Sequence, residues 1–300
     1  MDADEPHNGE RQPGERQPGE RQTGEPCVVL CDLDGVVWLA HHPIAGSVAA
    51  IAGLRAAGHR VLFVTNNSGD TIAVQEAALA GIGIPAVGDV LTSAMAAALL
   101  VQPGERVLVC GGDGVRQAVT SRGATVVTVD DAGSTADVVV DVVVDVVVVG
   151  FHRTFDYAGL TRAARAVWHG ARLIGTNDDA TYPTPRGPIP GGGAILAAVQ
   201  TASGVPAVVA GKPHAPMAQL VRSVIGEAAA IAAVMVGDRA STDGLFARTL
   251  GCAYAHVNSG VTPAGTPVSP VPDLIADDLA AVAAVVLGGW RPDRSPTAHS

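Results

Sequence analysis

The sequence has few of the features that membrane proteins and nucleic-acid-binding proteins need. Lys and Arg number 19 against 29 Asp and Glu, so the net charge is −10. A nucleic-acid partner is therefore not expected, because it requires a basic face. No apolar run reaches the length of a membrane span, since Asp interrupts the longest Val-rich stretch. The N-terminus is polar and acidic, unlike a signal peptide. We expect a globular protein of the cytoplasm.

Cysteine is also scarce. The four cysteines are Cys27, Cys31, Cys110 and Cys252. The first two lie four residues apart on one predicted strand, about 13 Å when extended, and cannot pair. All four are typical of small buried residues in a reducing compartment. No Cys/His spacing indicates zinc, and the adjacent His41 and His42 favour a solvated loop over a metal site.

The length and the repeats suggest how the chain is divided. Three hundred residues can bury a large core and favour two domains. Residues 1–25 repeat Gly-Glu-Arg-Gln-Pro with small changes, which predicts a disordered tail, and 289–300 is expected to be a second tail. The segment 137–149 repeats Asp-Val-Val-Val and would extend about 43 Å, too long for an ordinary strand. We expect its last copy, 145–149, to be the strand and the earlier copies to form an edge or a loop.

The most informative stretch is Cys27–Trp38. The apolar run that begins it reads as a buried strand, and it meets Asp32 and Asp34 directly. Side chains two apart on an extended chain point the same way, and Gly35 allows a sharp turn after them. Two adjacent buried carboxylates need a shared cation or a proton. The alternative is an ordinary turn with solvated aspartates.

Strand and helix patterns alternate along the chain. Strands are predicted at 27–31, 60–64, 106–110, 145–149, 173–174, 205–210, 232–236 and 253–257. Helices are predicted at 47–57, 71–80, 160–169, 194–202, 215–225 and 277–287. This alternation predicts an α/β fold with a doubly wound parallel sheet, in which ligands bind at the carboxyl ends of the strands.

Polar side chains follow four of the predicted strands. They are Asp32-x-Asp34, Thr65-Asn66, Lys212, and Asp238 with Asp243. One parallel sheet would bring all of them to the same edge. Three carboxylates there favour a hard divalent cation with oxygen ligands, most simply Mg²⁺. A lysine and a Thr/Asn pair favour an anion, and a dianionic phosphate fits both requirements.

With these motifs in order, the sequence resembles the haloacid dehalogenase-like hydrolases, the aspartate-nucleophile phosphatases. The matching residues are Asp32-Leu33-Asp34-Gly35, Thr65, Lys212, and Gly237-Asp238 through Asp243. Thr176-Asn177-x-Asp179, Pro190-Gly191 and Gly193 resemble subfamily IIA, which contains the NagD-like, 4-nitrophenyl phosphate, phosphoglycolate and pyridoxal phosphate phosphatases. The resemblance covers about 27–290.

The resemblance implies a Rossmann-like core at 26–99 and 204–288, with an inserted α/β C2-type cap at 100–203. Two features depart from it or vary within it. His152-Arg153 stands where such caps often carry Asp-Arg, and Tyr182 occupies a position that varies with substrate. The 1–25 and 137–149 repeats match nothing in the family.

The resemblance also implies a role for each motif residue. Asp32 would attack phosphorus and form an aspartyl-phosphate, while Asp34 would act as general acid and base. Mg²⁺ would be held by the Asp32 carboxylate, the Asp34 backbone oxygen and Asp238. Thr65, Asn66, Asn67 and Lys212 would hold the phosphoryl oxygens, with Asp243 supporting them. Asn177, Asp178 and Tyr182 are the candidates for contacting the leaving group.

Other functions remain open at this point. A phosphotransferase or mutase could use the same fold, and a binding protein could hold a phosphorylated metabolite with little turnover. A dehalogenase is disfavoured, because that branch lacks a second aspartate like Asp34. The substrate is expected to be a small phosphorylated metabolite, and the cap could form a homodimer.

Overall fold

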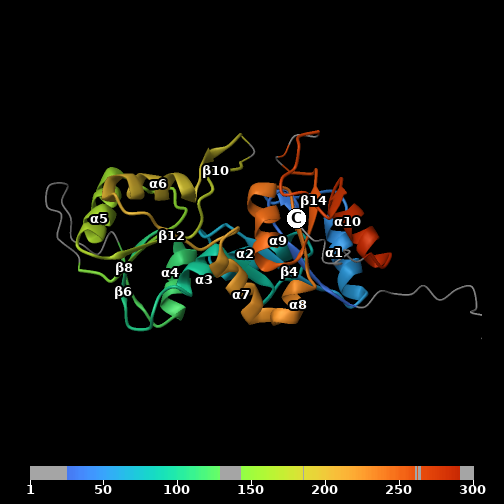
Figure 1. The fold of residues 1–300 in the computed structure, drawn as a ribbon, viewed down its shortest axis with the longest axis horizontal. Coiled ribbons are helices and arrows are strands. Elements are labelled where there is room, and N and C mark those ends of the chain that lie inside the picture. The colour runs from blue at the N-terminus through green and yellow to red at the C-terminus, as the bar shows by residue number, and fades with distance from the viewer. Residues whose placement is uncertain (1–25, 129–142, 185, 261, 263–264, 291–300) are drawn as a thin grey trace, which may run out of the picture.

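The computed structural model describes residues 26–128, 143–184, 186–260, 262 and 265–290. The predicted tail at 1–25, most of the predicted C-terminal tail and the first copies of the Asp-Val repeat lie outside these residues. The described chain forms two lobes side by side (Figure 1). One lobe is built around a larger parallel sheet, and the other around a smaller one.

The larger sheet carries the N-terminal and C-terminal parts of the chain. Its strands are β1 (Val28–Cys31), β4 (Arg60–Thr65), β5 (Val90–Thr92), β13 (Val234–Gly237), β14 (Ala253–Val257) and β15 (Leu274–Ala276). They run in the order β15-β14-β13-β1-β4-β5, and all neighbours are parallel. Because β1 lies between β13 and β4, the carboxyl ends of these three strands meet at one edge.

The smaller sheet holds the middle of the chain. Its strands are β6 (Arg106–Cys110), β7 (Thr125–Thr128), β8 (Val146–Val149), β9 (Arg172–Gly175) and β12 (Val208–Val209). They run in the order β12-β9-β8-β6-β7, again all parallel. β8 is the last copy of the Asp-Val repeat, as predicted for 145–149. The predicted α/β class with parallel sheets is confirmed.

The helices and two short hairpins complete the described fold. The helices are α1 (Ser47–Ala56), α2 (Ile72–Gly81), α3 (Ser93–Ala98), α4 (Asp113–Ser121), α5 (Tyr157–Trp168), α6 (Gly192–Ser203), α7 (Ala215–Ile225), α8 (Glu227–Ile231), η2 (Ala240–Gly244), α9 (Leu245–Leu250) and α10 (Leu279–Leu287). The hairpins are β2 (Trp38–Leu39) with β3 (His42–Pro43), and β10 (Thr181–Tyr182) with β11 (Ile189–Pro190).

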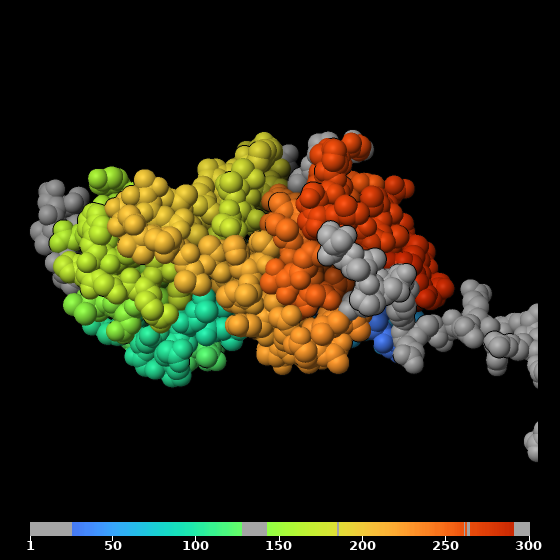
Figure 2. Space-filling view, viewed as in Figure 1, coloured from blue at the N-terminus to red at the C-terminus, as the bar shows by residue number. Residues whose placement is uncertain are grey.

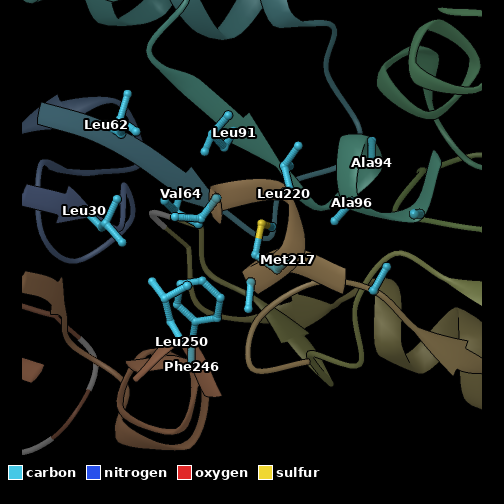
Figure 3. Close-up of a cluster of buried hydrophobic side chains, with 14 of the residues drawn as sticks. Leu30, Leu62, Val64, Leu91, Ala94, Ala96, Met217, Leu220, Phe246 and Leu250 are labelled. Carbon is cyan, nitrogen blue, oxygen red and sulfur yellow. The ribbon is translucent and has the colours of Figure 1, made fainter. Parts of the chain in front are cut away.

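One apolar cluster joins the two sheets. Figure 3 shows Leu30, Leu62 and Val64 of the larger sheet together with Met217 and Leu220 of α7. The same cluster includes side chains from the smaller sheet, namely Val107, Val109, Val146, Val148 and Ile174. Each large apolar side chain buried in this way contributes about 1.5–3 kcal/mol. The shared cluster therefore fixes the smaller sheet to the larger one beside the edge where β1, β4 and β13 end.

The structure corrects the prediction that the strand at 205–210 lies in the same sheet as β1, β4 and β13. This segment becomes the short strand β12, which pairs with β9 in the smaller sheet. Val208 is aligned with Ile174, and Val209 with Gly175. The strand before Lys212 thus pairs with the smaller sheet, while the boundary at residue 204 stays a prediction. Strand partners are chosen by non-local hydrogen bonds, which an apolar run cannot specify.

Several smaller features bear on the sequence predictions. All four cysteines are free thiols, and burial raises the pKa of Cys31 and Cys110 to about 12. Trp290, predicted to lie in the C-terminal tail, packs against the apolar cluster between α1, α10 and the larger sheet. Within the described ranges, no helix has both the length and the apolar character needed to cross a membrane.

Candidate active site

Asp32 and Lys212 form the centre of the site. Asp32 follows β1, and its backbone N–H donates to the carbonyl of Val236 in β13 (2.9 Å). The Lys212 Nζ lies 2.9 Å from Asp32 Oδ1 and donates to Asp243 Oδ1 at 2.7 Å. The side chains of Lys212 and Asp243 are buried, whereas Asp32 keeps 14% of its side chain exposed. Asp32 is therefore the most exposed member of this ion-pair chain, and Lys212 also lines the cleft.

The charge state of Lys212 follows from its two partners. Burial by itself would lower the pKa of this ammonium group, but the charges of Asp243 and Asp32 outweigh it and raise the pKa above its usual value. A buried lysine with two hydrogen-bonded carboxylates stays protonated at any physiological pH. The site therefore contains one permanent cation next to Asp32, which suits a phosphoryl oxygen.

Asp34 is a partly buried carboxyl with a raised pKa. Burial raises the pKa of Asp34 to about 7, and the nearby charges of Asp32 and Asp238 add to the effect. Gly35 turns the chain after it with a φ of +88°. A side chain at residue 35 would be strained, and its Cβ would lie 2.6 Å from the carboxyl carbon of Asp238. The glycine thus allows β1 and β13 to place their aspartates close together.

Three carboxylates gather at the edge of the larger sheet. Oxygen atoms of Asp32, Asp238 and Asp243 all lie within 4.8 Å of one another. Asp238 and Asp243 are buried. Such a cluster fits a hard divalent cation such as Mg²⁺, which prefers carboxylate oxygens and offsets their repulsion. The Asp34 side chain is not part of this cluster, and a metal contact through its backbone oxygen stays a prediction.

The predicted phosphate-binding residues differ in how their side chains are used. Thr65 and Asn67 line the same cleft as Asp32 and Lys212. The Asn67 N–H donates to Thr65 Oγ1 (3.0 Å), which shapes the turn after β4. Asn66 also lines the cleft, but its amide is engaged with Lys212 and Asp179. Both hydrogens of its side-chain amide are therefore engaged within the protein, and phosphate binding by the Asn66 region stays a prediction.

The three predicted cap residues have three different environments. Tyr182 lines the cleft and stacks on Phe151. Asn177 also lines the cleft but is buried, and its Nδ2 donates to the Asn66 carbonyl (2.8 Å). Asp178 forms an ion pair with His214 (3.0 Å) and is not among the residues that line the cleft. Its role as a leaving-group contact stays a prediction.

The structure adds residues that the sequence reasoning did not assign. Asp179 and Arg239 line the cleft, and so do Leu39 and Ala40 from the β2–β3 hairpin. Asp179 was visible as part of Thr176-Asn177-x-Asp179, and Arg239 directly follows Asp238. The β10–β11 hairpin stands where the two lobes meet (Figures 1 and 2), and its residues Thr181 and Tyr182 line the cleft.

Comparison with known proteins agrees with this geometry. Residues 29–125 match a family model described as haloacid dehalogenase-like hydrolase, and residues 209–282 match a second, HAD-hydrolase-like model. The chain is similar to the D-glycerol 3-phosphate phosphatase of Mycobacterium tuberculosis, at 36% identity over 84% of this chain and 69% of that protein. It is 32% identical to a 5'-nucleotidase of Bacillus subtilis, over 78% of this chain and 87% of that protein.

Solved structures show the same likeness. A crystal structure of a glycerol phosphate phosphatase from Mycobacterium tuberculosis in complex with magnesium superposes with a TM-score of 0.74 at 33% identity, covering 86% of this chain and 77% of that one. The fold and the site define an α/β phosphatase with a C2-type cap. The chain belongs to the haloacid dehalogenase-like hydrolases, subfamily IIA type, and is a phosphoric monoester hydrolase.

Proposed function

We propose that this protein hydrolyses small phosphomonoesters in a Mg²⁺-dependent reaction through an aspartyl-phosphate on Asp32. The observation that carries the proposal is the position of Asp32. It is partly exposed to the cleft, while Lys212, bonded to the same carboxylate, is buried behind it. An incoming phosphoryl group thus meets a nucleophilic oxygen and a fixed cation together.

The covalent steps follow from the two aspartates of β1. An Asp32 oxygen forms a bond to phosphorus while the bond to the leaving oxygen breaks. Asp34 gives its proton to that oxygen, and its pKa of about 7 supports a protonated carboxyl near neutral pH. A water molecule then attacks phosphorus, Asp34 takes a proton from it, and the Asp32–phosphorus bond breaks to release phosphate.

The carboxylate cluster supports the cofactor part of the proposal. Asp32, Asp238 and the Asp34 backbone oxygen would hold Mg²⁺, and Asp243 would keep Lys212 in place. A bound divalent cation neutralises the repulsion between an anionic nucleophile and an anionic phosphate. Asp243 donates no proton to this chemistry, because Lys212 and the Arg239 N–H already bind its two oxygens.

The substrate class is proposed from the relatives and the cleft together. The relatives named above act on glycerol phosphate and on nucleotides. Here the cleft carries polar groups at its base and the Phe151–Tyr182 pair at its cap side. A small phosphorylated metabolite with a polar leaving group fits these walls. A panel of polyol, sugar and nucleotide monophosphates would identify it.

Release of inorganic phosphate from 4-nitrophenyl phosphate tests the function itself. The purified protein with Mg²⁺ is expected to turn over, and Asp32→Asn is expected to lose activity by more than about a hundredfold with its fold intact. Glu76→Gln, a change on the surface of α2, serves as the matched control. Tight binding of metabolites without phosphate release would favour the binding protein. Transfer of the phosphoryl group to a second metabolite faster than to water would favour the phosphotransferase.

The division into core and cap, the cytoplasmic location and a homodimer through the cap remain predictions. Limited proteolysis and sedimentation would test the first and the last of these.

A further inference from the structure

Lys212 approaches the active site from the smaller sheet. It follows β12, and the two residues before it are bonded to the β9 side of that sheet. The Ala210 N–H donates to Gly175 O (2.9 Å), and the Gly211 N–H donates to Thr176 O (2.7 Å). Hydrogen bonds within the smaller sheet therefore set the position of the Lys212 backbone. Its Nζ, in contrast, contacts Asp32 in the core. Something must hold that backbone in register with the core.

The side-chain amide of Asn66 does this. Asn66 follows Thr65 at the end of β4, in the core. Its Oδ1 accepts from the Lys212 N–H (2.8 Å), and its Nδ2 donates to the Lys212 carbonyl (3.0 Å). The amide thus pairs with both backbone groups of one residue, much as a neighbouring strand would. Gly211 permits this approach, since a Cβ there would lie 2.6 Å from Asn66 Oδ1.

The second hydrogen of the same amide goes to the cap. Asn66 Nδ2 donates to Asp179 Oδ2 at 2.9 Å. Both backbone groups of Asp179, the N–H and the carbonyl, form hydrogen bonds. Its N–H donates to Asn177 Oδ1 (3.2 Å), and its carbonyl accepts from the Gly193 N–H at the start of α6 (2.9 Å). The carboxylate is thereby aimed at Asn66 and is not a mobile surface group.

The backbone of Asn66 is fixed from both lobes as well. Its carbonyl accepts from Ser93 Oγ (2.8 Å) and from Asn177 Nδ2 (2.8 Å). A continuous series of hydrogen bonds and one ion pair now runs from the cap turn to the nucleophile: Asp179, Asn66, Lys212 and Asp32. We propose that Asp179 is a positioning residue which orients the Asn66 amide and so sets Lys212 against Asp32, making an intact cap turn a condition of the chemical step.

This inference rests on the proposed function and makes a prediction opposite to that for a substrate contact. A residue that touches the leaving group affects some substrates more than others. A residue that positions Lys212 affects every phosphomonoester, because the phosphoryl group and Lys212 are common to all of them. It also lowers kcat more than it raises KM, because the lysine acts on charge that develops during transfer.

Four variants test it. Asp179→Ala removes the acceptor, and we expect kcat to fall by at least about tenfold on 4-nitrophenyl phosphate and on the best metabolite alike. Asp179→Asn keeps an acceptor oxygen and should stay within about threefold of wild type. Asn66→Asp puts a carboxylate against Asp179 and should cost about a hundredfold or more. Asn66→Asp with Asp179→Asn reverses donor and acceptor and should regain at least about tenfold over Asn66→Asp.

Amide hydrogen exchange gives a readout that does not depend on turnover. The Lys212 N–H is expected to exchange faster in Asp179→Ala, although that change removes no bond to Lys212 itself. Asp277→Ala is the matched control, since it removes an exposed carboxylate that does not line the cleft. It should leave both the exchange rate and kcat unchanged.

The outcomes separate this inference from the proposed function. A wild-type protein that releases no phosphate contradicts the proposed function, while faster exchange at Lys212 in Asp179→Ala still supports the positioning role. An active wild type together with normal kcat and normal exchange in Asp179→Ala overturns the inference. A loss confined to one substrate makes Asp179 a leaving-group contact and overturns it too. The inference is also overturned if the kcat of the double variant is no higher than that of Asn66→Asp, provided that both variants unfold cooperatively on heating.

Discussion

The ring of Tyr182 stacks on the ring of Phe151, with centroids 5.0 Å apart and an interplanar angle of 17°. Tyr182 belongs to the β10 hairpin, and Phe151 lies just past the end of β8, so the pair joins two cap segments at the wall of the cleft. Burial raises the pKa of Tyr182 to about 12, so its hydroxyl stays protonated and can donate to a leaving group.

We therefore expect Tyr182→Ala to lower kcat/KM for the best metabolite by more than about tenfold, or about 1.4 kcal/mol. The rate with 4-nitrophenyl phosphate should change much less. Tyr182→Phe keeps the stacked ring, so it separates the hydroxyl from the aromatic surface. Equal losses on both substrates would assign the residue to the fold or the general chemistry, and no loss on either would place it outside the substrate contacts.

The second prediction concerns Asp34. Asp34→Asn keeps the size of the side chain but cannot give or take the proton, and general acid–base help is worth about 10²–10⁴-fold. Turnover should fall by about that factor. Phosphate should also accumulate on Asp32, because hydrolysis of the intermediate needs the same base. Acid quench followed by mass spectrometry measures the adduct, with Asp32→Asn as the variant that cannot form it. An adduct on another residue would contradict the assignment of the nucleophile.

The third prediction concerns the divalent cation. Activity should require Mg²⁺ and disappear after chelation, and added Mg²⁺ should restore it. Ca²⁺ should inhibit, since its larger and looser coordination sphere misplaces the Asp32 oxygen. Asp238→Asn should raise the Mg²⁺ concentration needed for half-maximal rate. Full activity after exhaustive dialysis against chelator would exclude the carboxylate cluster as a functional metal site.

The fourth prediction concerns the pH dependence of stability in the metal-free protein. The folded-state pKa of Asp34 is about 7, above its ordinary value of 3.8. The folded protein therefore holds this proton more tightly than the unfolded chain does. Its contribution to stability is fully present below about pH 4 and is lost as the pH rises toward 7.

Asp34→Asn removes this titration and leaves the other carboxylates in place. In chelator, the free energy of unfolding of the wild type should fall relative to that of Asp34→Asn between about pH 4 and pH 7. Chemical denaturation at several pH values measures the difference. Parallel curves for the two proteins would mean that Asp34 is ionised throughout the range.

Some features of the site depended only on local sequence. The apolar runs of β1, β4 and β13 are short, buried and bounded by turn residues, so their ends could be predicted. Asp32 and Asp238 directly follow β1 and β13, and Thr65 is the last residue of β4. The order of these motifs was enough to indicate the family and the chemistry. Such a strand end can be predicted from the sequence because it depends on interactions among residues that are close together in the chain.

The tertiary structure alone decided how the rest of the site is assembled. It placed β12, and with it Lys212, on the smaller sheet, and it turned Asp178 toward His214. It also paired the Asn66 amide with Lys212 and Asp179. The reason is that sheet membership and amide pairing depend on which distant backbone groups meet, and a short apolar run followed by a polar residue looks the same whichever sheet it joins.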